Sequence, residues 1–346
     1  MNESTVSLQE KVAFLSRPEA YPERTTAVTR RETHMSWVFL ADAKVYKLKK
    51  PVRFPYLDFS TLKRREAACR AELALNRRLA PDVYETVLPL VRTARGLAIG
   101  GKGETVDWLV VMRRLDEELT LEQALNSRRL TVAALDRLCG TLVDFYRRAN
   151  VVYVSAQRHL ANWERSLADN RRGLLDPRCK LSPGIITMID RAQRRFLAER
   201  PELIAERVRS RHIVDGHGDL RPEHIWLTDP IRIIDCIEFN SWLRVLDPFD
   251  EIAYLCVECD RLGGGWASEH IRRRTLHALA ADLPKELFAF YRCYRATLRA
   301  RLSIAHLLEP APRTPEKWPA LARAYLDLAA ADASRLSRAL KRRVNR

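Results

Sequence analysis

The stretch VDGHGDLRPEHIWLTDPIRIIDC, residues 214–236, places two histidines, five acidic residues and two arginines around two short apolar runs. Apolar runs of this kind belong in a protein interior, where charged groups without partners cost several kcal/mol. A bound cation and an anionic ligand are therefore the expected occupants of the site. The apolar runs then serve as scaffold, and the polar side chains carry the function.

A short β-hairpin is predicted within this stretch, because the two apolar runs flank a turn sequence, TDP, at 228–230. We expect a strand to begin at His224 and the returning strand to end at Asp235. If Leu227 pairs with Arg232, His224 lies directly opposite Asp235, with Cβ atoms about 5 Å apart. Asp219 lies five residues before His224, on a loop made supple by Gly216 and Gly218. The hairpin would then gather an imidazole and two carboxylates at its open end.

The rest of the chain divides into two patterns. A short N-terminal helix and then strand and hairpin signals, including a break at 41–43, dominate the first part. Helical periodicity dominates from Leu119 onward. The sequence therefore predicts an α+β protein with a strand-rich lobe, residues 1–114, and a larger helical lobe, residues 115–346. The connector is MRRLDEE, which begins at Met112.

The motif HGDLRPEHI (217–225), followed by IIDC (233–236), resembles the catalytic loop and metal-binding aspartate of the aminoglycoside phosphotransferase-like kinases. Those kinases share the two-lobed protein-kinase fold, with a small antiparallel-sheet N-lobe and a mostly helical C-lobe. Four further stretches resemble a bacterial branch of that superfamily: ETHMSWVFL (32–40), VYKLKKP (45–51), ELALNRRLAP (72–81) and DCIEFN (235–240). Members of the branch are often fused to a C-terminal P-loop ATPase domain. This sequence ends without one, so a separate P-loop ATPase is an expected candidate partner.

The resemblance implies catalytic roles for three residues. Asp219 would be the catalytic base that accepts or orients the proton of the substrate hydroxyl. Asp235 would bind Mg²⁺ between the β- and γ-phosphates of ATP. Position 224 is normally Asn, an oxygen ligand for a second Mg²⁺, but here it is His224. Because Mg²⁺ prefers oxygen ligands, either one metal suffices or the imidazole contacts phosphate or a metal-bound water. An ordinary strand-end histidine is the alternative.

A lysine and a glutamate of the first lobe are expected to bind the nucleotide together. The resemblance favours Lys47 over Lys49, which shares its strand face, as the group that reaches the α- and β-phosphates. Glu72 lies on the apolar stripe of a predicted helix over 63–80, whereas Glu66 shares its stripe with arginines. The periodicity therefore selects Glu72 as the partner of Lys47. In the alternative, both glutamates are surface charges.

The first turn of this lobe contains no glycine, although protein kinases cover the phosphates there with a Gly-rich loop. Thr33, His34 and Ser36 would instead supply hydroxyl, imidazole and backbone N–H donors to phosphate oxygens. An ordinary polar hairpin turn explains the same residues. Met112, at the start of the connector, completes the set of nucleotide-binding candidates.

Tyr291, Arg295 and Arg299 recur at i, i+4 and i+8, which places them on one helix face. Such a face suits a phosphate or carboxylate on the acceptor, and a solvated, salt-bridged face is the alternative. Glu238, three residues after Asp235, is a further candidate substrate contact. The formal net charge of +16, from 60 Lys and Arg against 44 Asp and Glu, disfavours polycationic aminoglycosides as acceptors.

The predicted function is an ATP- and Mg²⁺-dependent phosphotransferase that acts on a hydroxyl of a small neutral or anionic molecule. No basic, aromatic-interleaved platform indicates nucleic-acid binding. No run of roughly 18 apolar residues indicates a membrane span, so a cytoplasmic location is expected. One alternative is a metal-dependent hydrolase that uses His217, Asp219, His224 and Asp235. The other is a nucleotide-binding pseudokinase or adaptor.

Overall fold

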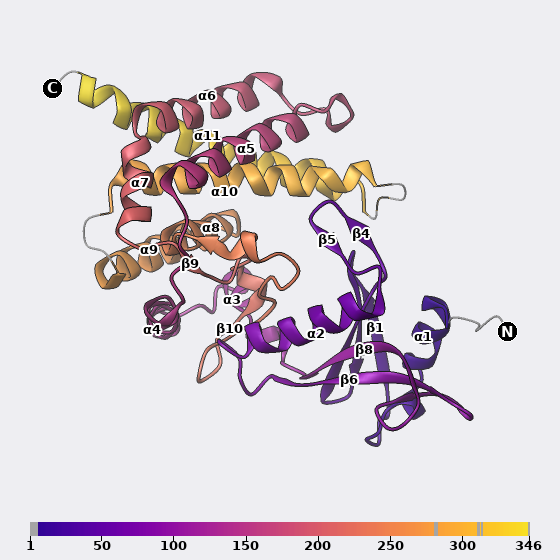
Figure 1. Ribbon diagram of the computed structural model, residues 1–346. Coiled ribbons are helices and arrows are strands. Elements are labelled where there is room, and N and C mark those ends of the chain that lie inside the picture. Colours follow the sequence, from indigo (N-terminus) through magenta and orange to yellow (C-terminus); the bar gives the residue numbers. More distant parts are fainter. Residues whose placement is uncertain (1–5, 280–282, 310–311, 313, 345–346) are drawn as a thin grey trace. The chain divides into compact units, whose positions relative to one another are not determined.

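The computed structural model describes residues 6–279, 283–309, 312 and 314–344 (Figure 1). Its contacts divide the chain into two compact units. The first comprises Met1–Leu119 with Arg232–Leu243, and the second comprises Thr120–Ile231 with Arg244–Arg346. The predicted lobes were continuous segments, 1–114 and 115–346, whereas residues 232–243 pack with the first unit.

The first unit is built on an antiparallel sheet of six strands in the order β1-β2-β3-β8-β6-β7 (Figure 1). The sheet strands are β1 Val28–Glu32, β2 Ser36–Ala41, β3 Lys44–Lys49, β6 Tyr84–Thr93, β7 Gly96–Ile99 and β8 Glu104–Arg113. The unit also contains α1 Leu8–Leu15, α2 Leu62–Asn76, β4 Arg53–Phe54, β5 Leu57–Asp58, β11 Arg232–Ile233, and 3₁₀ helices Pro18–Ala20 and Glu117–Leu119. The predicted β2–β3 hairpin is confirmed, with Ala41 paired to Lys44 across a two-residue turn.

The two faces of this sheet are covered by different helices. Tyr46 and Leu48 of β3 pack in one buried cluster with Val12 and Leu15 of α1. The neighbouring β8 residue Val110 packs instead with Cys69 of α2 and other residues on the opposite face. Because successive strand residues point to opposite faces, Lys47 and Lys49 lie on the face of α2. This alternation brings two lysines to a helix that carries a buried glutamate.

The second unit is mostly helical, as predicted. Its helices are α3 Leu121–Asn126, α4 Val132–Arg148, α5 Ala156–Leu174, α6 Pro183–Glu199, α7 Pro201–Arg209, α8 Pro248–Arg261, α9 Gly265–Leu279, α10 Lys285–Ala305 and α11 Lys317–Val344. Strands β9 Val214–Asp215 and β12 Val245–Leu246 pair antiparallel. Short 3₁₀ helices lie at Pro177–Cys179, Pro222–His224 and His306–Leu308, and another, Ser241–Arg244, lies at the boundary of the units.

The predicted strand that begins at His224 is wrong at its first residue. His224 is the last residue of the 3₁₀ helix Pro222–His224, and the strand is only β10, Ile225–Trp226. Pro222 at the first helical position explains the difference, because its fixed φ favours a helical turn there. His224 belongs to the second unit and Asp235 to the first. The register that would place them opposite each other therefore stays a prediction.

Among the described residues, none of the helices combines the length and apolar composition needed to cross a membrane. All seven cysteines are buried free thiols. The scattered cysteines of the sequence are therefore interior side chains in this fold.

Candidate active site

Lys47 and Glu72 form a partly buried ion pair between β3 and α2. The Lys47 Nζ lies 2.8 Å from Glu72 Oε1 and 3.0 Å from Asp235 Oδ1. Glu72 is fully buried, whereas Glu66 lies on the outer side of the helix, 2.8 Å from Arg70. The selection of Glu72 over Glu66 as the partner of Lys47 is therefore confirmed. Its role toward a nucleotide remains a prediction.

A second lysine extends this ion pair into a chain of alternating charges. Lys49 Nζ lies 2.6 Å from Glu72 Oε2 and also contacts the carboxylate of Glu238. The sequence reasoning missed this role of Lys49, although its position two residues after Lys47 already placed it on the same strand face. Glu238 was predicted to contact substrate, but its side chain is 9% exposed and is held by Lys49. The structure therefore gives Glu238 an internal partner.

Burial and the two ammonium groups act in opposite directions on these acids. Burial opposes ionisation of Glu72, but Lys47 and Lys49 offset this effect and leave the pKa of Glu72 below its ordinary value. For Glu238, burial prevails over Lys49, and its pKa is raised. The pKa of Lys47 is raised because Asp235 and Glu72 outweigh burial. Of these two glutamates, Glu72 is therefore the one whose charged form the site favours.

The lowered pKa of Glu72 predicts a specific acid sensitivity. A glutamate in an unfolded chain has a pKa of about 4.3. Because the folded-state pKa is lower, the ion pairs of Glu72 stabilise the fold fully above about pH 4.3, and this contribution is lost as the pH falls through the folded value. Between pH 6 and pH 3, the free energy of unfolding is therefore expected to fall more in the wild type than in Glu72→Gln. Urea unfolding at several pH values measures this difference, and equal pH dependence in the two proteins would contradict it.

Asp235 lies two residues after the end of the short strand β11 and has a left-handed backbone, with φ of 64°. Such a conformation is uncommon for residues other than glycine and is found at functional sites more often than elsewhere. Neighbouring backbone groups hold the segment, since the Cys236 N–H donates to Asn76 Oδ1 at 2.9 Å. The Asp235 side chain is 45% exposed. Its carboxylate therefore combines a fixed position with access to solvent, and carboxylate oxygen is a ligand that Mg²⁺ prefers.

The glycine-free turn between β1 and β2 is closed by its own side chains. The Thr33 hydroxyl donates to the Ser36 carbonyl at 3.0 Å and accepts from the Ser36 N–H at 3.0 Å. His34 is exposed at the tip of the turn. Thr33 and Ser36 therefore form an ordinary polar hairpin turn, and their predicted phosphate contacts would compete with these bonds. Met112 is a buried residue of β8, paired with Val45 and Tyr84.

Asp219 lies in the second unit, in a loop whose side chains contact one another. Tyr254 of α8 donates its hydroxyl to Asp219 Oδ1 at 3.0 Å, and Arg221 lies 2.9 Å from Oδ2. The Asp219 N–H donates to His217 Nδ1 at 3.3 Å, and His217 is buried. His217 is therefore a buried hydrogen-bonding support of this loop. Both oxygens of Asp219 are oriented by donors.

The brace of this loop is Glu251, which the sequence reasoning did not identify. Glu251 Oε2 accepts from the His217 N–H at 3.0 Å, and the Gly218 N–H donates to Oε1. Asp247, four residues earlier, caps α8 and pairs with Arg207 at 2.6 Å. A Cβ at Gly216 would lie 2.9 Å from Glu251 Oε2, so this close approach requires glycine.

His224 is 8% exposed, and both of its ring nitrogens have partners. Nδ1 lies 2.9 Å from the Asp219 carbonyl oxygen, and Nε2 lies 3.1 Å from Arg221 Nη2. The predicted role of His224 as a metal ligand therefore does not fit this geometry. The residue ties the loop around Asp219 together instead.

The row Tyr291, Arg295 and Arg299 of α10 is not the exposed acceptor surface that was predicted. Tyr291 is fully buried and donates to Asp247 Oδ2 at 3.2 Å. Arg295 makes a bidentate pair with Asp250, and Arg299 lies 2.6 Å from Glu258 Oε1. The alternative, a solvated salt-bridged face, is right about the salt bridges but wrong about the solvent, because these ion pairs lie in the interior. The three side chains therefore have a structural role.

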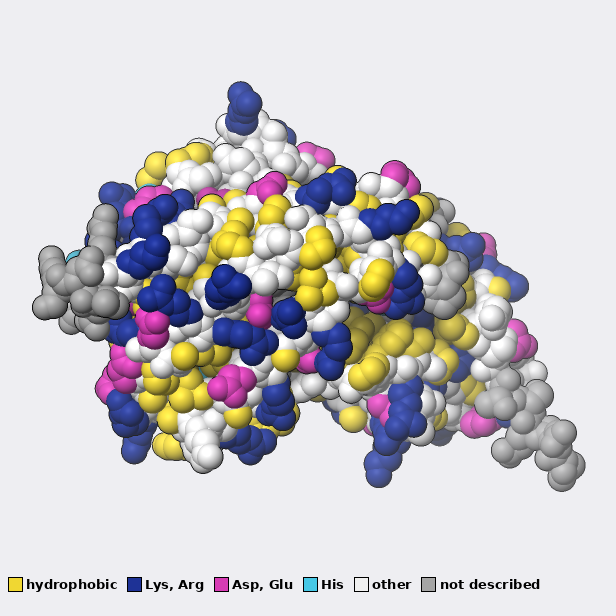
Figure 2. Space-filling view, turned by 90° about the horizontal axis from the view of Figure 1, so that it is seen from above, with side chains coloured by type: hydrophobic (Ala, Val, Ile, Leu, Met, Phe, Trp, Pro, Cys, Tyr) yellow, Lys and Arg dark blue, Asp and Glu magenta, His cyan; other side chains and the backbone are white. Residues whose placement is uncertain are grey.

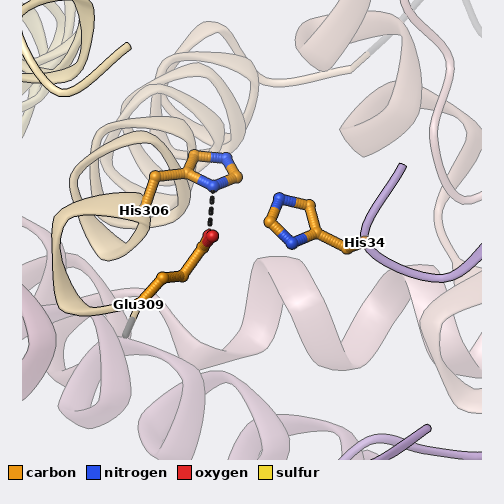
Figure 3. A group of neighbouring side chains, drawn as sticks. All are labelled: His34, His306 and Glu309. Carbon is orange, nitrogen blue, oxygen red and sulfur yellow. Dashed lines mark hydrogen bonds and ion pairs between the residues drawn. The ribbon is translucent and has the colours of Figure 1, made fainter. Parts of the chain in front are cut away.

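The excess basic charge is dispersed on the face of the second unit that Figure 2 shows, where Lys and Arg side chains alternate with acidic and apolar ones. On α6, for example, Arg194 and Arg195 pair with Asp190 and Glu199. Another pair joins His306 Nδ1 to Glu309 Oε1 at 2.7 Å (Figure 3). Two side chains are fewer than the three or four protein ligands of a zinc site, and this pair of the second unit is an i,i+3 contact.

The architecture of the two units defines the class of the protein. The antiparallel six-stranded sheet with its Lys–Glu pair, together with the mainly helical second unit, is an aminoglycoside phosphotransferase-like fold, which is a form of the protein-kinase fold. The predicted fold class is therefore confirmed.

Three solved structures illustrate this fold similarity. A choline/ethanolamine kinase family protein from Mesorhizobium loti has a TM-score of 0.53 and 14% identity, with 94% of each chain covered. The GDP complex of a mutant of aminoglycoside 2'-phosphotransferase IIIa has a TM-score of 0.52 and 14% identity, covering 94% of this chain and 98% of that one. A ternary complex of aminoglycoside phosphotransferase APH(4)-Ia with AMP-PNP and hygromycin B has a TM-score of 0.51 and 12% identity, covering 92% and 97%. At these identities the similarity concerns the fold alone.

Sequence comparison finds relatives with higher identity than these solved structures, but the names of these relatives state no function. The chain is 32% identical over 285 residues to the uncharacterized protein Rv2004c of Mycobacterium tuberculosis and to its Mycobacterium bovis counterpart Mb2027c. The match covers 82% of this chain and 56% of each relative, so the chain spans little more than half of their length. No model of a known protein family matches the sequence.

Proposed function

We propose that this protein is an ATP- and Mg²⁺-dependent phosphotransferase that moves the γ-phosphoryl group to a hydroxyl of a small molecule. The observation that carries the proposal is the partly buried Lys47–Glu72 pair, in contact with Asp235, within a kinase-like fold. A cation placed beside an accessible carboxylate suits a phosphate group and its metal ion. Two of the proteins with a similar fold were solved with GDP or AMP-PNP, which supports nucleotide use here.

The proposed chemistry divides among four residues. Lys47 binds phosphate oxygens while Lys49 remains on Glu72, so the buried carboxylate keeps a cation when Lys47 turns to the nucleotide. Asp235 supplies an oxygen ligand, and bound Mg²⁺ would neutralise phosphate charge. Asp219 accepts the proton of the acceptor hydroxyl, and Tyr254 and Arg221 hold its carboxylate in one orientation.

The acceptor is proposed to be a neutral or anionic hydroxylated compound, because the chain has a net charge of +16. A cytoplasmic location and a P-loop ATPase that acts with this chain belong to the same proposal.

The direct test incubates the purified protein with γ-labelled ATP, Mg²⁺ and a library of sugars, nucleosides and hydroxy acids. Transfer of label to at least one acceptor is expected for the wild type and lost in Asp219→Asn. A library without any labelled product, or equal labelling by both proteins, would oppose the proposal.

The two alternatives make different demands on the same residues. A metal-dependent hydrolase would need imidazole ligands, but His224 has both ring nitrogens engaged and His217 Nδ1 accepts from the Asp219 amide. The hydrolase hypothesis also gives no role to Lys47 and Glu72. A pseudokinase or adaptor would be stabilised thermally by Mg-ATP but would transfer no phosphate, and the labelling assay separates it from the enzyme.

A further inference from the structure

Position 224 carries histidine where asparagine is expected from the resemblance. The hydrogen bonds of the His224 ring explain what this histidine does. Arg221 Nη2 lies 3.1 Å from His224 Nε2, and a guanidinium group can only donate hydrogen bonds. Nε2 must therefore accept with its single lone pair. On the other side, Nδ1 lies 2.9 Å from the Asp219 carbonyl oxygen, which can only accept. The pattern assigns a neutral imidazole with its proton on Nδ1.

A histidine in this state has no lone pair to offer a metal ion. Metal binding through Nε2 would require the guanidinium of Arg221 to leave, and binding through Nδ1 would require loss of its proton and of the bond to the loop carbonyl. The ring is also buried at 8% exposure, which leaves little room for rearrangement. Moreover, nitrogen is a poor ligand for Mg²⁺ compared with the amide oxygen of asparagine. The residues at this position therefore do not fit a second Mg²⁺.

Arg221 places a fixed positive charge at the same position. Its Nη2 lies 2.9 Å from Asp219 Oδ2, and Nη1 lies 2.5 Å from Glu223 Oε1. Burial lowers the pKa of Arg221, but Asp219, Tyr254 and Glu223 raise it by more, so its pKa lies above the ordinary value. The guanidinium is therefore permanently charged beside the carboxylate that we propose as the catalytic base. His224 fixes its orientation by accepting one of its N–H groups.

We propose that this protein uses a single divalent cation and that Arg221, oriented by His224, supplies the positive charge that a second metal would bring beside Asp219. The part of this inference that concerns the nucleotide-bound protein rests on the proposed phosphotransferase function. It makes His224 a positioning residue and not a ligand. It also predicts that His224→Asn, which restores an oxygen ligand and removes the ring nitrogen that accepts from Arg221, creates a second metal site.

The first measurement counts Mn²⁺ bound to the protein in the presence of AMP-PNP, by electron paramagnetic resonance of the free ion. One tightly bound Mn²⁺ per chain is expected for the wild type and two for His224→Asn. The matched control is His270→Asn, which changes a partly buried histidine paired with Asp136 at 2.9 Å and should leave the count at one. Two bound ions in the wild type would overturn the inference, and so would a count of one in His224→Asn.

The second measurement needs no nucleotide and separates this inference from the proposed function. Long-range ¹H–¹⁵N NMR correlations of the imidazole rings, assigned with His224→Asn, report which nitrogen carries the proton. The inference expects His224 to be protonated on Nδ1 and the ¹⁵N shifts of its ring to stay unchanged as diamagnetic Mg²⁺ is added at stoichiometric amounts. Protonation on Nε2, or a selective shift of these ring nitrogens on addition of Mg²⁺, would overturn it. If AMP-PNP does not bind at all, the proposed function fails, while the NMR result still decides the role of His224.

Discussion

Replacing Lys49 with methionine is expected to reduce the free energy of unfolding by about 3–5 kcal/mol, the range for removing one partner of a buried ion pair. The Lys49 side chain is 1% exposed and contacts both Glu72 and Glu238. Its loss would leave Glu238 buried without this cation and Glu72 with only Lys47. Chemical denaturation that follows the transition of the first unit measures the change through its midpoint.

Lys44→Met is the matched control in the same strand. Lys44 pairs with Glu23 and Glu85 at the surface, where an ion pair contributes about 0–1 kcal/mol. The double variant Lys49→Met/Glu238→Gln should recover part of the loss, because the carboxylate left behind is then neutral. If Lys49→Met is no less stable than Lys44→Met, the buried charge network does not stabilise the fold as we describe.

Asp219→Asn is expected to lower the rate of phosphoryl transfer by about 10²–10⁴-fold, the usual contribution of a positioned general base. The amide keeps the shape of the side chain and can still accept from Tyr254, so the fold should be preserved. Initial rates at saturating ATP, measured with the acceptor found in the screen, give the ratio.

The control for this variant is Asp229→Asn, because Asp229 lies in the exposed turn at 228–230 of the same stretch. It should keep the wild-type rate. An Asp219→Asn enzyme with more than about a tenth of the wild-type rate would remove Asp219 from the role of base, since the expected loss is at least about 10²-fold.

Local sequence patterns were sufficient for much of this fold. The β2–β3 hairpin followed from strand signals on either side of a break at 41–43, and Glu72 was selected over Glu66 by helical periodicity alone. Both inferences depend on which face of one element is buried. Such a face is encoded in the spacing of residues within that element.

Other features depend on which segments meet in space, and spacing does not encode this. The spacing of Tyr291, Arg295 and Arg299 correctly gave one helix face but did not reveal that the acids of α8 cover it. The same limit applies to Lys49, whose second partner, Glu238, lies 189 residues away. Glu251 was missed because a bracing carboxylate on a buried helix has no local signature beyond its own charge. At 224, Pro222 at the start of a helical turn overrode the strand pattern.

The most direct test of the central claim is isothermal titration of the protein with Mg-ATP, in the wild type and in Lys47→Met. Glu72 retains Lys49 in this variant, so the protein is expected to remain folded. We expect one nucleotide per wild-type chain, with a Kd between about 1 µM and 1 mM. Loss of a charged hydrogen-bond donor worth about 1.5–3 kcal/mol should weaken binding about 10- to 100-fold in Lys47→Met. A wild-type protein that does not bind Mg-ATP, or a folded Lys47→Met that binds it equally well, would contradict the claim.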